Sequence, residues 1–150
     1  ALLYLHGFNS SSASPKARLV KAACETLARH EGRPFACLTP DLSYRPDLAW
    51  QQAEAALESL GHEDTLLVGS SMGGFLATLL AERYGLRAVL INPAVRPARF
   101  VADYLGQTLL NDASGEQFTI DNSYFDQLTA LQWERIVHPS RYLLLLGSAD

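Results

Sequence analysis

Five short apolar runs, each of strand length, recur along the chain and are separated by segments with helical periodicity. Buried strands of a parallel sheet have nearly continuous apolar sequences because both of their faces are covered. Strands that alternate with helices are typical of βαβ units. We therefore expect an α/β fold with a mostly parallel sheet and helices on both faces. The predicted strands are Ala1–Leu5, Phe35–Leu38, Thr65–Val68, Ala88–Ile91 and Tyr142–Leu146.

Three segments between these runs have the pattern of helices. Ser14 and Pro15 supply an N-cap and a first-turn proline for the first of them. The last is apolar almost all round, which predicts a buried helix. The segments are 15–30, with Leu19, Ala22, Ala23 and Leu27 at helical spacing, 47–60, with a single apolar stripe, and 74–84.

The connection between the fourth and fifth runs, residues 92–141, is too long for a simple crossover and is rich in aromatic side chains. Two stretches within it, near 97–105 and 123–134, have helical character. Long elaborated connections in compact domains are often functional. We expect a lid-like insertion at about 97–135 that covers part of a pocket. The alternative is a helical layer with a purely structural role.

The composition excludes several classes of protein. Of the 150 residues, 48% are hydrophobic and 19% are charged, a balance that is ordinary for a single globular domain over 1–150 and atypical of disorder. Lys and Arg number 12 against 16 Asp and Glu, and there is no basic run, so we expect neither nucleic acid nor a membrane surface as a partner. No apolar stretch approaches the ~18 residues of a spanning helix. A small-molecule substrate is the expected partner, and the oligomeric state stays open.

The two cysteines, Cys24 and Cys37, form no Cys-x-x-Cys pair and predict reduced thiols in or near the core. The sequence opens on an apolar segment without a basic leader or cleavage pattern, so we expect a cytoplasmic protein. It stops at Asp150, directly after a predicted strand. We therefore expect that the C-terminal strand and helix of the fold are missing from it.

The strongest local signal is a Gly-x-Ser-x-Gly pattern at Gly69, Ser71 and Gly73, between a predicted strand and a predicted helix. This context is the one that a nucleophile elbow requires, because the sharp turn holds the serine in a strained conformation and leaves no room for side chains two residues away. The serine hydroxyl then lies above the N-terminus of the following helix, which favours negative charge. The alternative is a glycine-rich helix cap. A phosphate loop fits less well, because no lysine follows the glycines.

A second signal, His6-Gly7-Phe8, directly follows the first predicted strand. The loop at this place in a hydrolase supplies one backbone donor of the oxyanion hole, and the residue after the nucleophile supplies the other. We assign the donors as the backbone N–H groups of Phe8 and Met72. We expect His6 to brace the loop by hydrogen bonds and not to be the catalytic base.

A catalytic acid and base are then required. Asp150 follows a late strand, where the acid falls in the chain order Ser, Asp, His; the alternative is that it caps a helix. His30 closes a predicted helix, and His62 and His138 precede strands at the opposite end of the sheet from Ser71. None of these three is expected to reach the serine. The base is therefore expected beyond residue 150, and the alternative is a triad-deficient protein that binds without catalysing.

Several motifs together resemble the YqiA-type small bacterial esterases, members of the α/β-hydrolase superfamily, over essentially the whole chain. This resemblance implies a serine esterase that needs no cofactor or metal, with Ser71 as nucleophile and Asp150 as acid. It also implies a base in a glycine-rich loop after one further strand. The motifs are Leu-Tyr-Leu-His-Gly-Phe-Asn-Ser at 3–10, Val-Gly-Ser-Ser-Met-Gly-Gly at 68–74, Ile-Asn-Pro-Ala-Val-Arg-Pro at 91–97 and Asp-Tyr-Leu-Gly at 103–106.

These signals combine into a hypothesis of ester hydrolysis through an acyl-enzyme. An apolar pocket would favour short or medium acyl esters, with acyl thioesters as a further class. The competing hypotheses are another hydrolase activity, such as a thioesterase or peptidase, and a non-catalytic binding module. Arg96 and Arg99 could contact an anionic substrate group or could be ordinary surface residues. The pocket residues expected besides Phe8 are Tyr44, Val95, Tyr104 and Phe118.

Overall fold

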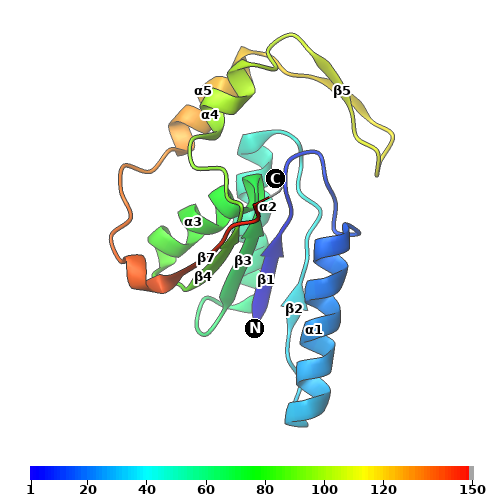
Figure 1. Cartoon of the computed structure of the whole chain (residues 1–150), viewed down its shortest axis with the longest axis vertical. Helices are drawn as coiled ribbons and strands as arrows, with labels where there is room; N and C mark the ends of the chain where they lie inside the picture. Colours follow the sequence, from blue (N-terminus) through cyan, green and yellow to red (C-terminus); the bar gives the residue numbers. More distant parts are fainter. Residues whose placement is uncertain (149–150) are drawn as a thin grey trace.

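A five-stranded parallel sheet forms the centre of the computed structural model, which describes residues 1–148 (Figure 1). The strand order is β2-β1-β3-β4-β7, and every neighbouring pair runs parallel. The α/β expectation is confirmed, with strand ends that differ from the predicted runs by at most two residues. The strands are β1 (Leu2–Leu5), β2 (Cys37–Leu38), β3 (Leu66–Ser70), β4 (Ala88–Ile91) and β7 (Tyr142–Leu145).

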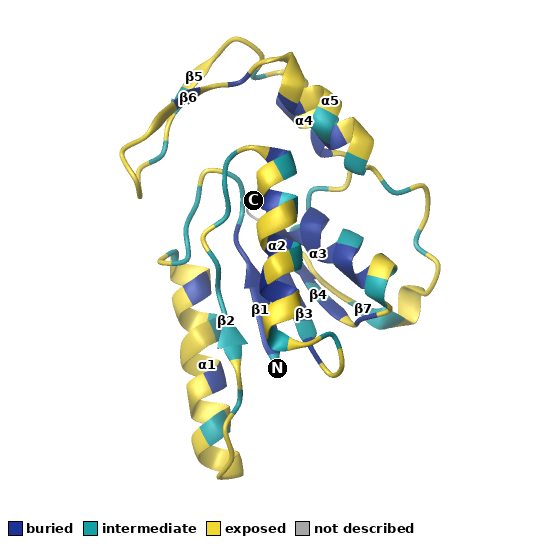
Figure 2. Ribbon diagram, turned by 180° about the vertical axis from the view of Figure 1, so that it is seen from behind, coloured by how far each residue is buried: buried dark blue, intermediate teal, exposed yellow. Residues whose placement is uncertain are grey.

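Three helices cover the two faces of this sheet: α1 (Pro15–Glu31), α2 (Pro46–Leu60) and α3 (Met72–Tyr84). Alternate strand residues point to opposite faces. Leu3 and Leu5 of β1 therefore pack in one core with α2 and α3, whereas Leu2 and Tyr4 pack against α1. The helix α3 is buried along most of its length, as its sequence predicts (Figure 2). Among residues 1–148, no helix combines the length and the apolar character needed to cross a membrane.

Two expectations about burial are wrong. The helix α1 packs through Ala17 and Cys24, while Leu19 of the predicted stripe is 71% exposed. The run at the end of the chain forms β7, but its leucines are about half exposed and not buried on both faces. The physical reason is position: β7 lies at the edge of the described sheet, where it pairs with β4 alone.

The connection between β4 and β7 contains the helices α4 (Pro97–Ala102) and α5 (Asn122–Leu131) and the short 3₁₀ turn η1 (Pro139–Arg141). It also contains a hairpin that the sequence analysis did not predict, formed by β5 (Thr108–Leu110) and β6 (Gln117–Thr119). Figure 1 shows α4, α5 and the hairpin beyond the carboxyl ends of the central strands. These carboxyl ends are where ligands bind in open α/β sheets.

Candidate active site

Ser71 stands at the junction between β3 and α3 with φ 53° and ψ −117°, a strained conformation for a residue other than glycine. Its backbone N–H donates to the Ile91 carbonyl at the end of β4, over 3.1 Å. Its own carbonyl accepts from the Ala94 N–H at 2.9 Å and from the first turn of α3. These bonds hold the strained turn from both sides, and its side chain is exposed above the N-terminus of α3.

The two glycines of the pattern are required by close backbone contacts. A Cβ atom at Gly69 would lie 2.6 Å from the Gly73 carbonyl carbon. A Cβ atom at Gly73 would lie 2.5 Å from the His6 carbonyl oxygen and closer still to that of Leu5. The start of α3 therefore packs directly against the end of β1, which brings the elbow at Ser71 and the loop after β1 together.

The loop after β1 lies beside the serine. A Cβ atom at Gly7 would be 3.4 Å from Ser71 Cβ and 3.9 Å from Ser71 Oγ. Phe8 follows in this loop, and Met72 is the first residue of α3, whose backbone N–H has no partner within the helix. The two residues assigned as oxyanion donors therefore lie next to Ser71 and line the same pocket. Their role in catalysis stays a prediction.

His6 braces this loop from inside. It is 3% exposed, and its Nε2 accepts a hydrogen bond from the Leu42 N–H at 2.9 Å. Because Nε2 is an acceptor, the ring proton is on Nδ1, which donates to the Gly7 carbonyl at 2.8 Å. Burial lowers the pKa of His6, and the Gly7 hydrogen bond and the charge of Asp41 oppose this only in part. A neutral ring with both nitrogens engaged supports the bracing role expected for His6.

Asp41 ties a second loop to the same region. Its Oδ1 accepts from the Ser12 N–H at 2.7 Å, and this hydrogen bond lowers the pKa of Asp41. The carboxylate thus joins the segment after β2 to the segment after β1. Together with the bond from Leu42 to His6, it fixes the path of residues 6–12 next to the elbow.

Asn92 connects the elbow to the end of β7, and the sequence analysis gave it no role. It adopts a positive φ of 42°, its N–H donates to the Leu145 carbonyl, and its Oδ1 accepts from the Gly147 N–H at 2.8 Å. The signal in the sequence was an asparagine directly after a strand and before Pro93, because asparagine tolerates the left-handed region. Asn92 is therefore a positioning residue for the segment that leads towards Asp150. Asp150 itself lies outside the described residues.

We expect Asn92→Ala to lower the free energy of unfolding by about 2 kcal/mol, since it loses a hydrogen bond and places alanine at a positive φ. Asn92→Gly removes the same bond without the backbone penalty, so it should lose only about 1 kcal/mol. Urea denaturation of the three proteins measures both effects. Equal losses for the two variants would show that the backbone conformation contributes nothing.

A pocket of about 270 Å³ opens in front of Ser71. It contains Val95, one of the predicted pocket residues, and it contains Arg96 but not Arg99. Among residues 1–148, Arg96 forms no ion pair. The pocket is lined by Phe8, Ser71, Met72, Asn92, Ala94, Val95, Arg96, Pro97 and Phe100.

The other predicted pocket residues lie in an aromatic cluster or next to it. The ring of Phe118, on the hairpin, stacks on Tyr44 at 4.1 Å and meets Phe8 edge-on at 5.8 Å. The Tyr44 hydroxyl donates to Glu116, so the hairpin is bonded to the loop before α2. Tyr104 does not line the Ser71 pocket itself but packs on Phe100, which does, with the ring centroids 4.8 Å apart. The structure brings Phe8, Tyr44 and Phe118 together, and their contact with substrate stays a prediction.

The remaining histidines lie where the sequence analysis expected them. His30 is exposed at the end of α1, and His138 is exposed before η1. His62 follows α2 and packs on the Tyr84 ring at 4.4 Å. His62 and His138 thus precede β3 and β7, at the amino ends of strands whose carboxyl ends lie near Ser71. Within residues 1–148, the structure offers no histidine base to the serine.

This site can be compared with known proteins. The model of the uncharacterised protein family UPF0227 matches residues 1–150. The chain belongs to this family. The assignment confirms the resemblance to YqiA-type proteins that the motifs indicated.

Solved structures similar to this UPF0227 member have the α/β-hydrolase fold, which confirms the expected fold class. The mouse alpha/beta hydrolase domain-containing protein 10 is 16% identical with a TM-score of 0.72. The match covers 99% of this chain and 80% of the mouse protein's chain. A protein named "Putative hydrolase" from Agrobacterium vitis S4 is 21% identical with a TM-score of 0.66. That match covers 87% of this chain, which spans 60% of the length of the bacterial protein. A structure from the metagenome-derived lipolytic enzymes LipS and LipT is 18% identical, with a TM-score of 0.59. That match covers 87% of this chain and 64% of the lipolytic enzyme.

Proposed function

We propose that this chain carries the nucleophile and oxyanion hole of a serine hydrolase that cleaves carboxylic esters. The observation that carries the proposal is the backbone of Ser71, held at φ 53° between β3 and α3 with glycines at Gly69 and Gly73 where no side chain fits. The lipolytic activity named for one structural neighbour agrees with this proposal. Strain at a single exposed serine, maintained by bonds from two neighbouring segments, is typical of a functional residue.

In the proposed reaction, Ser71 Oγ attacks the ester carbonyl as its proton passes to a histidine base. The backbone N–H groups of Phe8 and Met72 stabilise the oxyanion, and the N-terminus of α3 adds a favourable dipole. The base then protonates the departing alcohol, and water cleaves the acyl-enzyme by the reverse proton transfers. We propose that this histidine lies outside residues 1–148 and is oriented by Asp150.

The pocket in front of Ser71 supports a small ester as substrate. Its apolar lining, including Val95, Pro97 and Phe100, would hold a short or medium chain. Arg96 would face a negatively charged group in this pocket, which keeps acyl thioesters with anionic carriers as a further substrate class. In this proposal the insertion at about 97–135 acts as a lid that restricts the access of water to the pocket.

Treatment of the full-length protein with a fluorophosphonate tests the nucleophile. We expect a single covalent adduct on Ser71, measured by intact mass and peptide mapping, and no adduct on Ser71→Ala. Ser70→Ala is the matched control because it changes the adjacent serine, which is buried, and it should still be labelled. Ester hydrolysis by Ser71→Ala should fall on the order of 10³-fold or more.

Two outcomes would contradict this proposal. Labelling that persists in Ser71→Ala would place the nucleophile elsewhere. Absence of labelling together with unaltered ligand binding in Ser71→Ala would favour the non-catalytic binding module. Parallel assays with p-nitrophenyl esters, acyl-CoA and peptide amides separate an esterase from a thioesterase or peptidase.

A further inference from the structure

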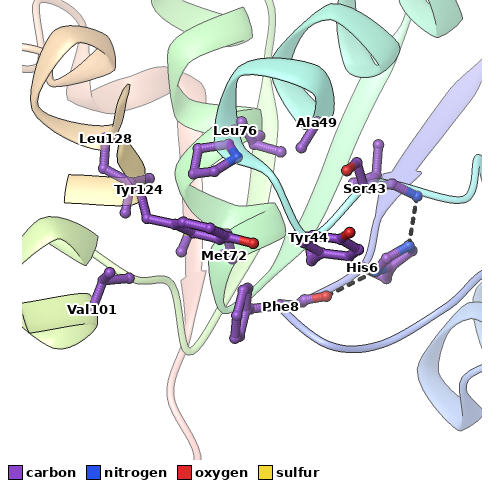
Figure 3. Close-up of a pocket in the computed structure, with 13 residues that line it drawn as sticks. His6, Phe8, Ser43, Tyr44, Ala49, Met72, Leu76, Val101, Tyr124 and Leu128 are labelled. Carbon is purple, nitrogen blue, oxygen red and sulfur yellow. Dashed lines mark hydrogen bonds between the residues drawn. The ribbon is translucent and has the colours of Figure 1, made fainter. Parts of the chain in front are cut away.

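A second, smaller pocket lies behind the wall of the Ser71 pocket. Its free volume is about 20 Å³, which is room for one water-sized group. It is mostly apolar and lies between the loop after β1, the start of α2 and the helices α3 and α5. The side chains that matter here are Phe8, Tyr44, Met72, Leu76, Tyr124 and Leu128 (Figure 3).

Phe8 and Met72 line both pockets. These two residues therefore lie between the Ser71 pocket and the small one. Their backbone N–H groups are also the proposed oxyanion donors. An acyl group whose carbonyl oxygen is bound by these two donors would accordingly begin beside Phe8 and Met72, next to the small pocket.

Tyr124 places a hydroxyl in this pocket that lacks a protein partner. The residue is 4% exposed, and Figure 3 shows its hydroxyl end pointing from α5 towards Phe8 and Tyr44. Within residues 1–148, no hydrogen bond to this hydroxyl is formed. Burial raises the pKa of Tyr124, so the group remains a protonated donor throughout the neutral range.

Three of the other five tyrosines have a partner for their hydroxyl group. The hydroxyls of Tyr44, Tyr84 and Tyr142 each donate to a glutamate side chain. Among the described residues, every fully enclosed side-chain nitrogen or oxygen has a hydrogen-bond partner, so the unpartnered Tyr124 hydroxyl is not enclosed by protein and opens onto the pocket. A donor left open next to the reacting centre is therefore suited to a partner that arrives with the substrate.

We propose that the small pocket is an acyl subsite in which the Tyr124 hydroxyl donates a hydrogen bond to an oxygen on a short acyl chain. The substrate class is esters of small hydroxy or keto acids. This inference rests on the proposed esterase function and adds its acyl preference. The limit on size follows from the volume, which admits one water-sized group and excludes a long alkyl chain.

The test compares ethyl 3-hydroxybutyrate and ethyl acetoacetate with ethyl butyrate, using the full-length protein and Tyr124→Phe. In Tyr124→Phe, kcat/KM should fall about tenfold or more for the two oxygenated esters, because a site built around a hydrogen bond loses its advantage when one partner is removed. For ethyl butyrate, kcat/KM should change less than about twofold. Tyr84→Phe is the control, because it removes a tyrosine hydroxyl that donates to Glu54 and lines neither pocket, and it should leave kcat/KM for all three esters unchanged.

A second measurement avoids turnover. Ethyl 3-hydroxybutyrate should bind Ser71→Ala about tenfold more tightly than the double variant with Tyr124→Phe, as measured by NMR titration. Equal losses for all esters would assign Tyr124 a structural role and overturn the inference. No change for any ester would assign its hydroxyl to solvent and would also overturn it. Failure of the esterase function itself is seen separately, as absence of the fluorophosphonate adduct on Ser71.

Discussion

Gly73→Ala is expected to abolish fluorophosphonate labelling of Ser71 and to destabilise the protein by about 3 kcal/mol or more. The added methyl group would lie 2.5 Å from the His6 carbonyl oxygen and closer to that of Leu5. These are backbone atoms at the end of β1, which pairs with β3 through Leu5 and Gly69. Relief of the clash therefore requires either separation of two central strands or displacement of the start of α3, and both move the serine.

Urea denaturation and labelling of the same preparations measure this prediction. Gly32→Ala is the control, because Gly32 has a positive φ of 63° and no atom within 4 Å of the added Cβ. It should cost about 1 kcal/mol from backbone strain alone and leave labelling intact. A Gly73→Ala protein with the stability and labelling of the Gly32→Ala protein would show that the elbow does not need a glycine there.

The elbow was predictable because each of its parts has a local sequence signal. A buried strand, a glycine-bounded serine and an apolar helix follow one another within 65–84, and the structure forms them in that order. The parallel sheet was predictable for a similar reason. Near-continuous apolar runs that alternate with helices leave few other ways to bury both faces of the strands.

Burial was less predictable because periodicity identifies a face without stating what covers it. Two faces of α1 have residues at helical spacing. One face includes Leu19, and the other includes Ala17 and Cys24. The second set consists of small residues, which allow the helix to approach β1 and β2 closely. The hairpin was missed because β5 and β6 have three residues each, too few for an alternating pattern to be recognised.

The small pocket could not be predicted because it is assembled from distant parts of the chain. Phe8, Tyr44, Met72 and Tyr124 meet only after the insertion packs over the sheet. The pairing of Asn92 with Gly147 across 55 residues is of the same kind. Single-sequence patterns report on neighbours along a helix or strand, whereas these contacts depend on how separate elements are placed.

His6→Ala is expected to lower ester hydrolysis about 100-fold and the free energy of unfolding by about 2–3 kcal/mol. The variant leaves the buried Leu42 N–H without its acceptor and releases the Gly7 carbonyl. The loop that presents Phe8 beside Ser71 is then no longer fixed. A mispositioned oxyanion donor lowers kcat more than it raises KM, because the lost interaction is made mainly in the transition state.

His6→Gln separates the bracing role from titration. The glutamine side-chain oxygen can accept from the Leu42 N–H, so this variant should recover part of the lost stability and activity without a titrating ring.

Because burial lowers the pKa of His6 in the folded state, the unfolded state binds a proton at His6 first as the pH falls below about 6.5. The stability of the native protein is therefore complete above that pH and declines as the pH falls through the lowered pKa.

Urea denaturation at pH 7.5 and pH 5.5 measures this linkage. The free energy of unfolding should fall more between these values for the native protein than for His6→Gln. His30, His62 and His138 are present in both proteins, so the difference isolates the buried ring. An identical pH dependence would mean that His6 titrates alike in the folded and unfolded states. In that case the hydrogen bonds at Leu42 and Gly7 would be broken in solution, and the loop beside Ser71 would have to be held by Asp41 and the hairpin instead.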